Sequence, residues 1–102
     1  MWLMSVKPSD KPEKKYMATF CKCEKKSECK GTNYKTTHFG QKGSSTYIDH
    51  KDKKKKDAYI ARHRKNENWN DYTSAGSLSK YLLWNLPTLS QSIAYFKNKF
   101  KL

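Results

Sequence analysis

The stretch Thr88-Leu-Ser-Gln-Ser-Ile-Ala-Tyr-Phe-Lys-Asn-Lys-Phe100 decides the fold, because it carries the clearest helical pattern in the chain. Its threonine and the glutamine three residues later have the spacing of a capping box, in which each side chain binds a backbone group at a helix start. The apolar residues then recur at intervals of four, three and four residues: Leu89, Ile93, Phe96 and Phe100. This spacing predicts a helix with one continuous apolar stripe that packs on the rest of the chain.

Two further helices are expected before this one. Residues 53–65 are mostly strong helix formers, and Asp49 or Asp52 is a suitable cap for their start. The narrow apolar face of this helix consists of Tyr59, Ile60 and His63. A polar break at residues 66–72 separates it from the second helix.

The second helix is expected to begin after Thr73 or Ser74, either of which is a suitable cap. It is expected to end before Pro87, since the residue preceding a proline leaves the helical region. One face of this helix carries Leu78, Tyr81 and Leu82.

The first forty residues predict a β-hairpin. From Tyr16 to Cys21 the side chains alternate as in a strand, and a second strand rich in threonine and aromatic residues runs from Asn33 to Phe39. Residues 22–32 are charged and form the connection, while the glycines at 40 and 43 favour a turn after the second strand.

The segment before the hairpin, residues 1–14, contains two prolines and predicts an extended arm. Trp2 and Leu3 would be exposed on such an arm in a free monomer, so we expect them to serve as assembly contacts. The expected fold class is therefore α+β: an N-terminal extended arm, a β-hairpin and three short helices, with residues 15–102 packed in one small basic domain.

The net charge of the chain is +13, from 22 Lys and Arg against nine Asp and Glu. A field of this size attracts polyanions. Positive charge is densest in residues 51–65, and the candidate polyanion-binding residues are Lys51, Lys53, Lys54, Lys55, Lys56, Arg62, Arg64 and Lys65. Because lysine dominates, contact with phosphate is favoured over reading of base sequence. The alternative is a solvated helix face that only keeps the protein in solution.

Three cysteines, Cys21, Cys23 and Cys29, precede His38 and raise the question of a Cys₃His zinc site. Zinc ligands are usually separated by two to four residues, so the Cys-x-Cys spacing is unusual for such a site. We therefore expect ordinary loop and strand cysteines, with chance oxidation as a further possibility, and no metal or cofactor. An odd number of cysteines without a secretion signal favours a reducing intracellular compartment.

The aromatic segment Asn68-Trp-Asn-Asp-Tyr72 and the separate Trp84 are candidates for stacking on unpaired bases. The alternative is that these rings fill a junction between helices, and for Trp84 a core position is expected. The sequence contains no phosphate-binding glycine loop, nucleophile elbow or paired acids, so an enzyme is not expected.

Several blocks occur in an order that resembles a family of small uncharacterised proteins encoded by large nucleocytoplasmic DNA viruses of algae and protists. The resemblance covers residues 33–102. The blocks are Lys35-Thr-Thr-His-Phe-Gly-Gln-Lys-Gly43, Asp49-His-Lys-Asp52, Tyr59-Ile-Ala-Arg-His-Arg-Lys65, Glu67-Asn-Trp69, Ala75-Gly76 and Leu78-Ser79. The resemblance implies a viral setting. It assigns no activity to individual residues of this chain.

In that setting, the first expectation is a non-enzymatic structural protein of the virion, a minor capsid or cement component. Its basic face would bridge acidic capsid proteins, anionic membrane surface or DNA, and it would be located in the virion and inside the host cell. The alternative is a sequence-tolerant nucleic-acid-binding or genome-packaging protein.

Overall fold

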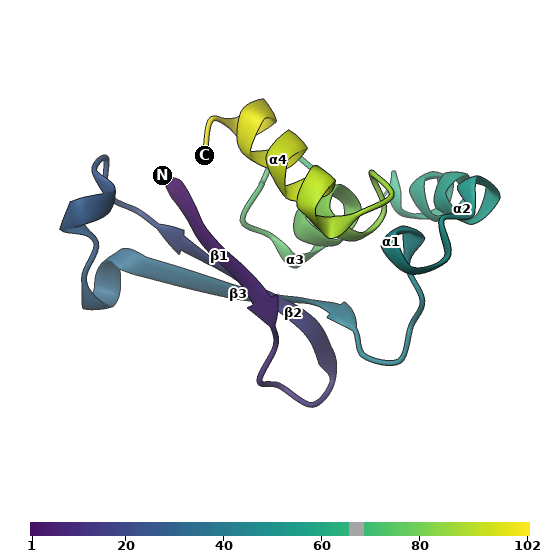
Figure 1. Cartoon of the computed structure of the whole chain (residues 1–102), viewed down its shortest axis with the longest axis horizontal. Helices are drawn as coiled ribbons and strands as arrows, with labels where there is room; N and C mark the ends of the chain where they lie inside the picture. The colour runs from purple at the N-terminus through teal and green to yellow at the C-terminus, as the bar shows by residue number, and fades with distance from the viewer. Residues whose placement is uncertain (66–68) are drawn as a thin grey trace.

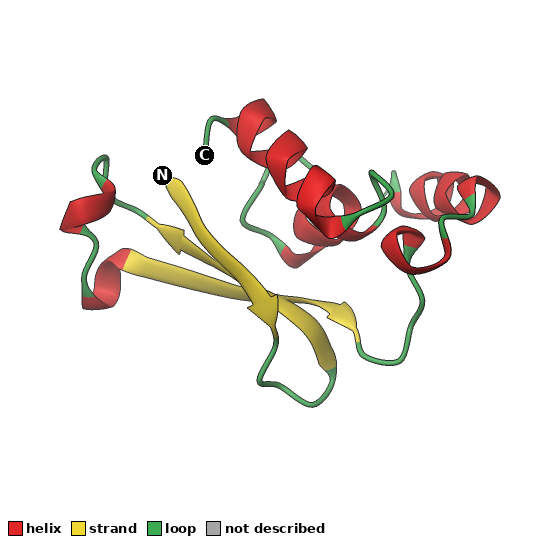
Figure 2. Cartoon of the chain, in the orientation of Figure 1, coloured by secondary structure: helices red, strands yellow, loops and turns green. Residues whose placement is uncertain are grey.

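The computed structural model describes residues 1–65 and 69–102 as a three-stranded antiparallel sheet with the helices gathered on one side (Figures 1 and 2). Strands β1 (Trp2–Pro8), β2 (Lys14–Cys21) and β3 (Tyr34–Gln41) lie side by side in that order. Sheet and helices form one small domain, which confirms the predicted α+β class. No helix in the described ranges has the length and apolar character needed to span a membrane.

The predicted free arm is wrong, because most of residues 1–14 belongs to the sheet. β1 pairs with β2 from Trp2 opposite Cys21 to Pro8 opposite Tyr16. Pro8 is tolerated because it lies at the end of an edge strand, where a missing N–H breaks no central ladder bond. Pro8 and Pro12 favoured an unpaired segment in the sequence. In the fold, the residues before Pro8 pair with β2, and one of them, Leu3, is buried in the core.

The hairpin of β2 and β3 is confirmed, with Lys14 opposite Gln41 and Cys21 opposite Tyr34. The connection between the strands contains two short 3₁₀ turns, η1 (Lys26–Glu28) and η2 (Gly31–Asn33). β3 continues past its predicted end through Gly40, which has φ +77°. A Cβ at Gly40 would lie 2.9 Å from Leu83 Cδ1, so glycine allows the sheet to approach the helical layer here.

The helical half contains more elements than predicted. They are α1 (Tyr47–His50), α2 (Lys53–His63), α3 (Ala75–Leu78), the π-helical segment η3 (Ser79–Leu83) and α4 (Leu89–Phe100). The cap predictions hold: Asp52 accepts from the amides of Lys54 and Lys55, and Ser74 accepts from Ser77. Part of the predicted polar break, residues 66–68, lies outside the described residues.

The helix predicted from the opening stretch is confirmed as α4. Its cap, Thr88, accepts from the Gln91 amide, and Phe96 is fully buried. Tyr81 of η3 packs against two rings of this helix, with centroid distances of 5.8 Å to Phe96 and 5.3 Å to Phe100. The core joins this helical layer to the sheet through Leu3, Ala18, Phe20, Phe39, Leu78, Tyr81, Leu82, Leu83, Phe96 and Leu102.

A second link joins the sheet to α1 through charge. Lys15 Nζ of β2 donates to Asp49 Oδ2 at 2.8 Å, and the same oxygen accepts from the amide and hydroxyl of Thr46, which caps α1. Partial burial raises the pKa of Asp49, but the hydrogen bonds from Lys15 and Thr46 and the Lys15 charge outweigh it and lower this pKa to about 2. Asp49 therefore favours folding as a carboxylate.

Replacing Phe96 with alanine should lower the free energy of unfolding by about 3–5 kcal/mol, the usual cost of truncating a buried aromatic ring. Tyr95→Ala is the matched control, because Tyr95 is the neighbouring ring on the same helix and is 45% exposed. Urea denaturation of both variants measures the difference. A loss below about 1 kcal/mol for Phe96→Ala would contradict its place in the core.

Asp49→Asn should destabilise the fold at pH 7 by about 1 kcal/mol, a figure kept small because this ion pair is partly exposed. The native carboxylate has a lowered pKa, so its contribution is present above the unfolded value of 3.8 and is lost as the pH falls towards 2. The gap between wild type and variant should therefore close between about pH 4 and pH 2. Denaturation across this range, with the exposed Asp57→Asn as control, tests it, and a gap independent of pH would refute it.

Candidate functional site

The basic stretch predicted from the sequence forms α2 and its flanks, at one end of the molecule (Figure 1). α2 contains no buried residue. The helix is held at its start by the Asp52 cap and along one side by Tyr59, whose ring stacks on Trp84 with centroids 4.4 Å apart and planes 3° apart. With no buried residue, α2 presents most of its surface to solvent.

Seven of the eight candidate polyanion-binding residues are exposed, and the exception is Lys56. Lys56 Nζ donates to the backbone oxygen of Asn85 at 2.6 Å and lies 5.1 Å from the ring centroid of Tyr47. Lys56 therefore joins α2 to the segment before α4 and to α1. Unlike the seven exposed candidates, Lys56 is partly buried, and its ammonium group has partners inside the fold.

The exposed cations lie on two flanks of the helix. Lys55 and Arg62 are seven residues apart, so they lie on the same flank, two turns from each other. On the opposite flank, Lys53 and Arg64 are eleven residues apart and again fall close together around the axis. An anionic polymer lying along α2 would therefore meet positive charge on either flank.

Beside the Arg62 flank lies a groove of about 780 Å³ between α2, the ends of β2 and β3, and the α3–η3 segment. Arg62 and His63 face it from α2, and Lys14 faces it from the start of β2. Hydroxyl groups of Ser44, Ser45, Thr46 and Ser79 also line it. Cations and hydroxyls around one hollow are suited to phosphate oxygens. The position of Lys14 beside this groove could not be predicted from the sequence, because Lys14 lies far from α2 along the chain.

The tryptophans are engaged within the fold. Trp84 is partly buried and packs against the core, and it also lines the groove, where its ring contacts His50 with centroids 5.4 Å apart. Trp69 packs against the core, and Lys80 Nζ lies 4.3 Å from its ring. These rings are engaged within the fold, which favours the helix-junction alternative over stacking on bases.

Positive potential extends beyond α2. Burial lowers the pKa of Lys80 on η3, and the charges of Lys99, Lys56 and Arg64 lower it further. Cations from α2, η3 and α4 are thus close enough to repel one another. Such mutual repulsion is relieved when an anion binds nearby.

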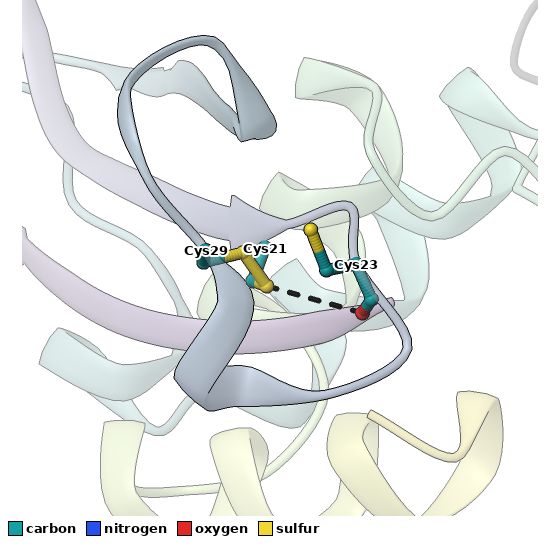
Figure 3. A group of neighbouring side chains, drawn as sticks. All are labelled: Cys21, Cys23 and Cys29. Carbon is teal, nitrogen blue, oxygen red and sulfur yellow. Dashed lines mark hydrogen bonds between the residues drawn. A yellow bond between two sulfur atoms is a disulfide. The ribbon is translucent and has the colours of Figure 1, made fainter.

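Three cysteines come together at the opposite end of the sheet, where β2 is connected to β3 (Figure 3). Cys21 and Cys29 form a disulfide, with their Cα atoms 5.8 Å apart, and Cys23 has a free thiol. All three sulfur atoms lie within 4.8 Å of one another. We expected ordinary loop and strand cysteines, with oxidation as a further possibility, and the structure has a disulfide because η1 turns the chain back and returns Cys29 to Cys21.

His38, the fourth ligand considered from the sequence, is not part of this cluster. It pairs with Met17, four positions along the hairpin from the pairing of Cys21 with Tyr34, and its Nδ1 lies 2.7 Å from the Ser9 hydroxyl.

The two predicted assembly contacts also have roles inside the chain. Leu3 is 3% exposed in the core, so it is not available to a neighbouring subunit in this fold. Trp2 Nε1 donates to the Glu24 backbone oxygen at 2.7 Å, and Lys26 Nζ lies 5.0 Å from the Trp2 ring. Trp2 thereby anchors the cysteine loop to β1.

Residues 4–63 match the model of a family of unknown function, DUF5754. The chain belongs to this family. The matched residues include the whole hairpin with its three cysteines, α1 and all of α2. None of the curated proteins and none of the solved structures matches the chain.

Proposed function

We propose that this member of DUF5754 is a non-enzymatic protein that binds the phosphate backbone of nucleic acid through α2 and the adjoining groove. The observation that carries the proposal is that α2 has no buried residue, yet it and its flanks present seven exposed cations. A helix that contributes little to the core is best explained by what its surface binds.

The chemistry of the cations supports backbone contact over base reading. Five of the seven exposed cations are lysines, which act as point charges and bind phosphate without the two-pronged geometry that distinguishes bases. Arg62, at the edge of the groove, has a guanidinium suited to a phosphate held between α2 and Lys14. Sequence-tolerant binding follows from this composition.

Binding should weaken steeply with salt, with a slope of about −4 to −7 in a plot of log affinity against log salt concentration, because each phosphate contact releases a counterion. Fluorescence anisotropy with labelled DNA duplexes of two unrelated sequences measures this. Similar affinities for both sequences are expected. A flat salt dependence, or a strong preference for one duplex, would count against backbone binding.

A pair of charge-matched variants locates the surface. Lys54→Gln, Lys55→Gln and Arg62→Gln together remove three charges from α2 and the groove edge, and should reduce the slope by about 3. Lys7→Gln, Lys11→Gln and Lys22→Gln remove the same charge from exposed positions on the sheet half. Equal losses in the two triple variants would show that only net charge matters and that α2 is not the site.

A second candidate comes from the resemblance of residues 33–102 to proteins of large DNA viruses. In that setting the same cations would bind acidic faces of capsid proteins, and the chain would be a minor capsid component. The incorporation of β1 into the sheet removes the free arm that this role was expected to use. Mass spectrometry of purified particles tests it, since a structural component should be present at a constant copy number, and absence from particles would eliminate it.

A further inference from the structure

We propose that the cluster of Cys21, Cys23 and Cys29 is a redox-controlled metal site, which binds zinc through three thiolates when the Cys21–Cys29 disulfide is reduced. This site is separate from the proposed nucleic-acid surface, which lies at the other end of the sheet (Figure 1). No step in the proposal depends on nucleic-acid binding.

The positions of the sulfur atoms carry the inference. In a tetrahedral zinc site with Zn–S bonds of about 2.3 Å, the sulfurs are about 3.8 Å apart. Here Cys23 already holds its sulfur within 4.8 Å of the two disulfide sulfurs. Opening the disulfide lets Cys21 and Cys29 separate by side-chain rotation, while their Cα atoms stay 5.8 Å apart.

The surrounding loop is held in place independently of the disulfide. Cys21 remains paired in the hairpin opposite Tyr34, whose hydroxyl donates to the Cys29 backbone oxygen at 3.2 Å. Trp2 binds the backbone of Glu24 in the same loop. Reduction therefore leaves the three thiols close together, which lowers the entropic cost of gathering metal ligands.

The charge of the loop also suits a metal–thiolate centre. Three thiolates around Zn²⁺ carry a net charge of −1. Residues 22–30 contain four lysines and two glutamates, a local excess of two positive charges. This excess offsets the negative centre, and soft thiolate ligands select Zn²⁺ over Mg²⁺ or Ca²⁺. Since the described part of the chain brings three ligands to this group, the fourth zinc position would be taken by water or another external ligand.

A dithiol can serve as the reductant that opens the Cys21–Cys29 disulfide. The dithiol transfers two electrons and two protons to the Cys21–Cys29 bond, giving two thiols, and is itself oxidised to a disulfide. Zinc then replaces the protons of the three thiols and releases them to solvent. A disulfide oxidant reverses the sequence, and zinc leaves as the bond forms again.

Titration of the full chain with Co²⁺, as a spectroscopic substitute for Zn²⁺, tests the proposal. After phosphine reduction, the chain should bind one Co²⁺ with sulfur-to-metal charge-transfer absorption, and Zn²⁺ should displace it. The air-oxidised chain should show no such absorption. Failure of the reduced chain to bind, or equal binding by the oxidised chain, would overturn the proposal.

Cys23→Ser is the decisive variant, because Cys23 is outside the disulfide and only partly buried, so the fold should survive its replacement. The reduced variant should lose the charge-transfer absorption, while its circular dichroism stays that of wild type. His38→Asn is the matched control, as a potential ligand outside the cluster, and should bind Co²⁺ as wild type does. Unchanged binding by Cys23→Ser would exclude the three-thiolate site.

Discussion

The structure depends on covering the one apolar face of a three-stranded sheet. A sheet of this size is not stable with such a face exposed to water. Phe20 and Phe39 project from the sheet into a core closed by Leu82 and Phe96, all four with 0% exposure. The close approach of Gly40 to Leu83 shows how tightly the two layers meet. Elements that take part in this contact need apolar residues at their buried positions. Elements outside it can accommodate a wider range of residue types.

α2 belongs to the second kind, and this explains its composition. The covering layer is supplied by η3 and α4, and α2 is attached through contacts that include the Asp52 cap, the Lys56 hydrogen bond and the Tyr59–Trp84 stack. Most of its remaining positions are open to charged residues without cost to the core. A lysine within reach of a backbone carbonyl can nevertheless be used for attachment, as Lys56 is, which is why charge alone overstates the number of exposed cations by one.

The sequence was most informative where the determinants are local. The capping residues and apolar stripe of α4 lie within thirteen residues, so its position could be predicted, and the same holds for the Asp52 and Ser74 caps. β1 could not be recognised in this way, since its place depends on pairing with β2 and on burial of Leu3 opposite Phe20, while its prolines argued locally for a loose segment. The groove was hidden for the same reason, because Lys14 and Arg62 meet only through the fold.

The cysteines show that spacing along the chain does not determine which sulfur atoms lie close together in the fold. The Cys-x-Cys spacing argued against zinc because paired zinc ligands are usually separated by two to four residues along the chain. In the folded chain the relevant distance is set by the hairpin, which fixes Cys21, and by η1, which returns Cys29 to it. Trp2 contributes from the far end of the sequence by holding the Glu24 backbone. The same tryptophan that seemed available to a partner is therefore part of the support of the sulfur cluster. The cluster depends on the edge strand, because β1 is fixed by Leu3 in the core and the loop is fixed by β1.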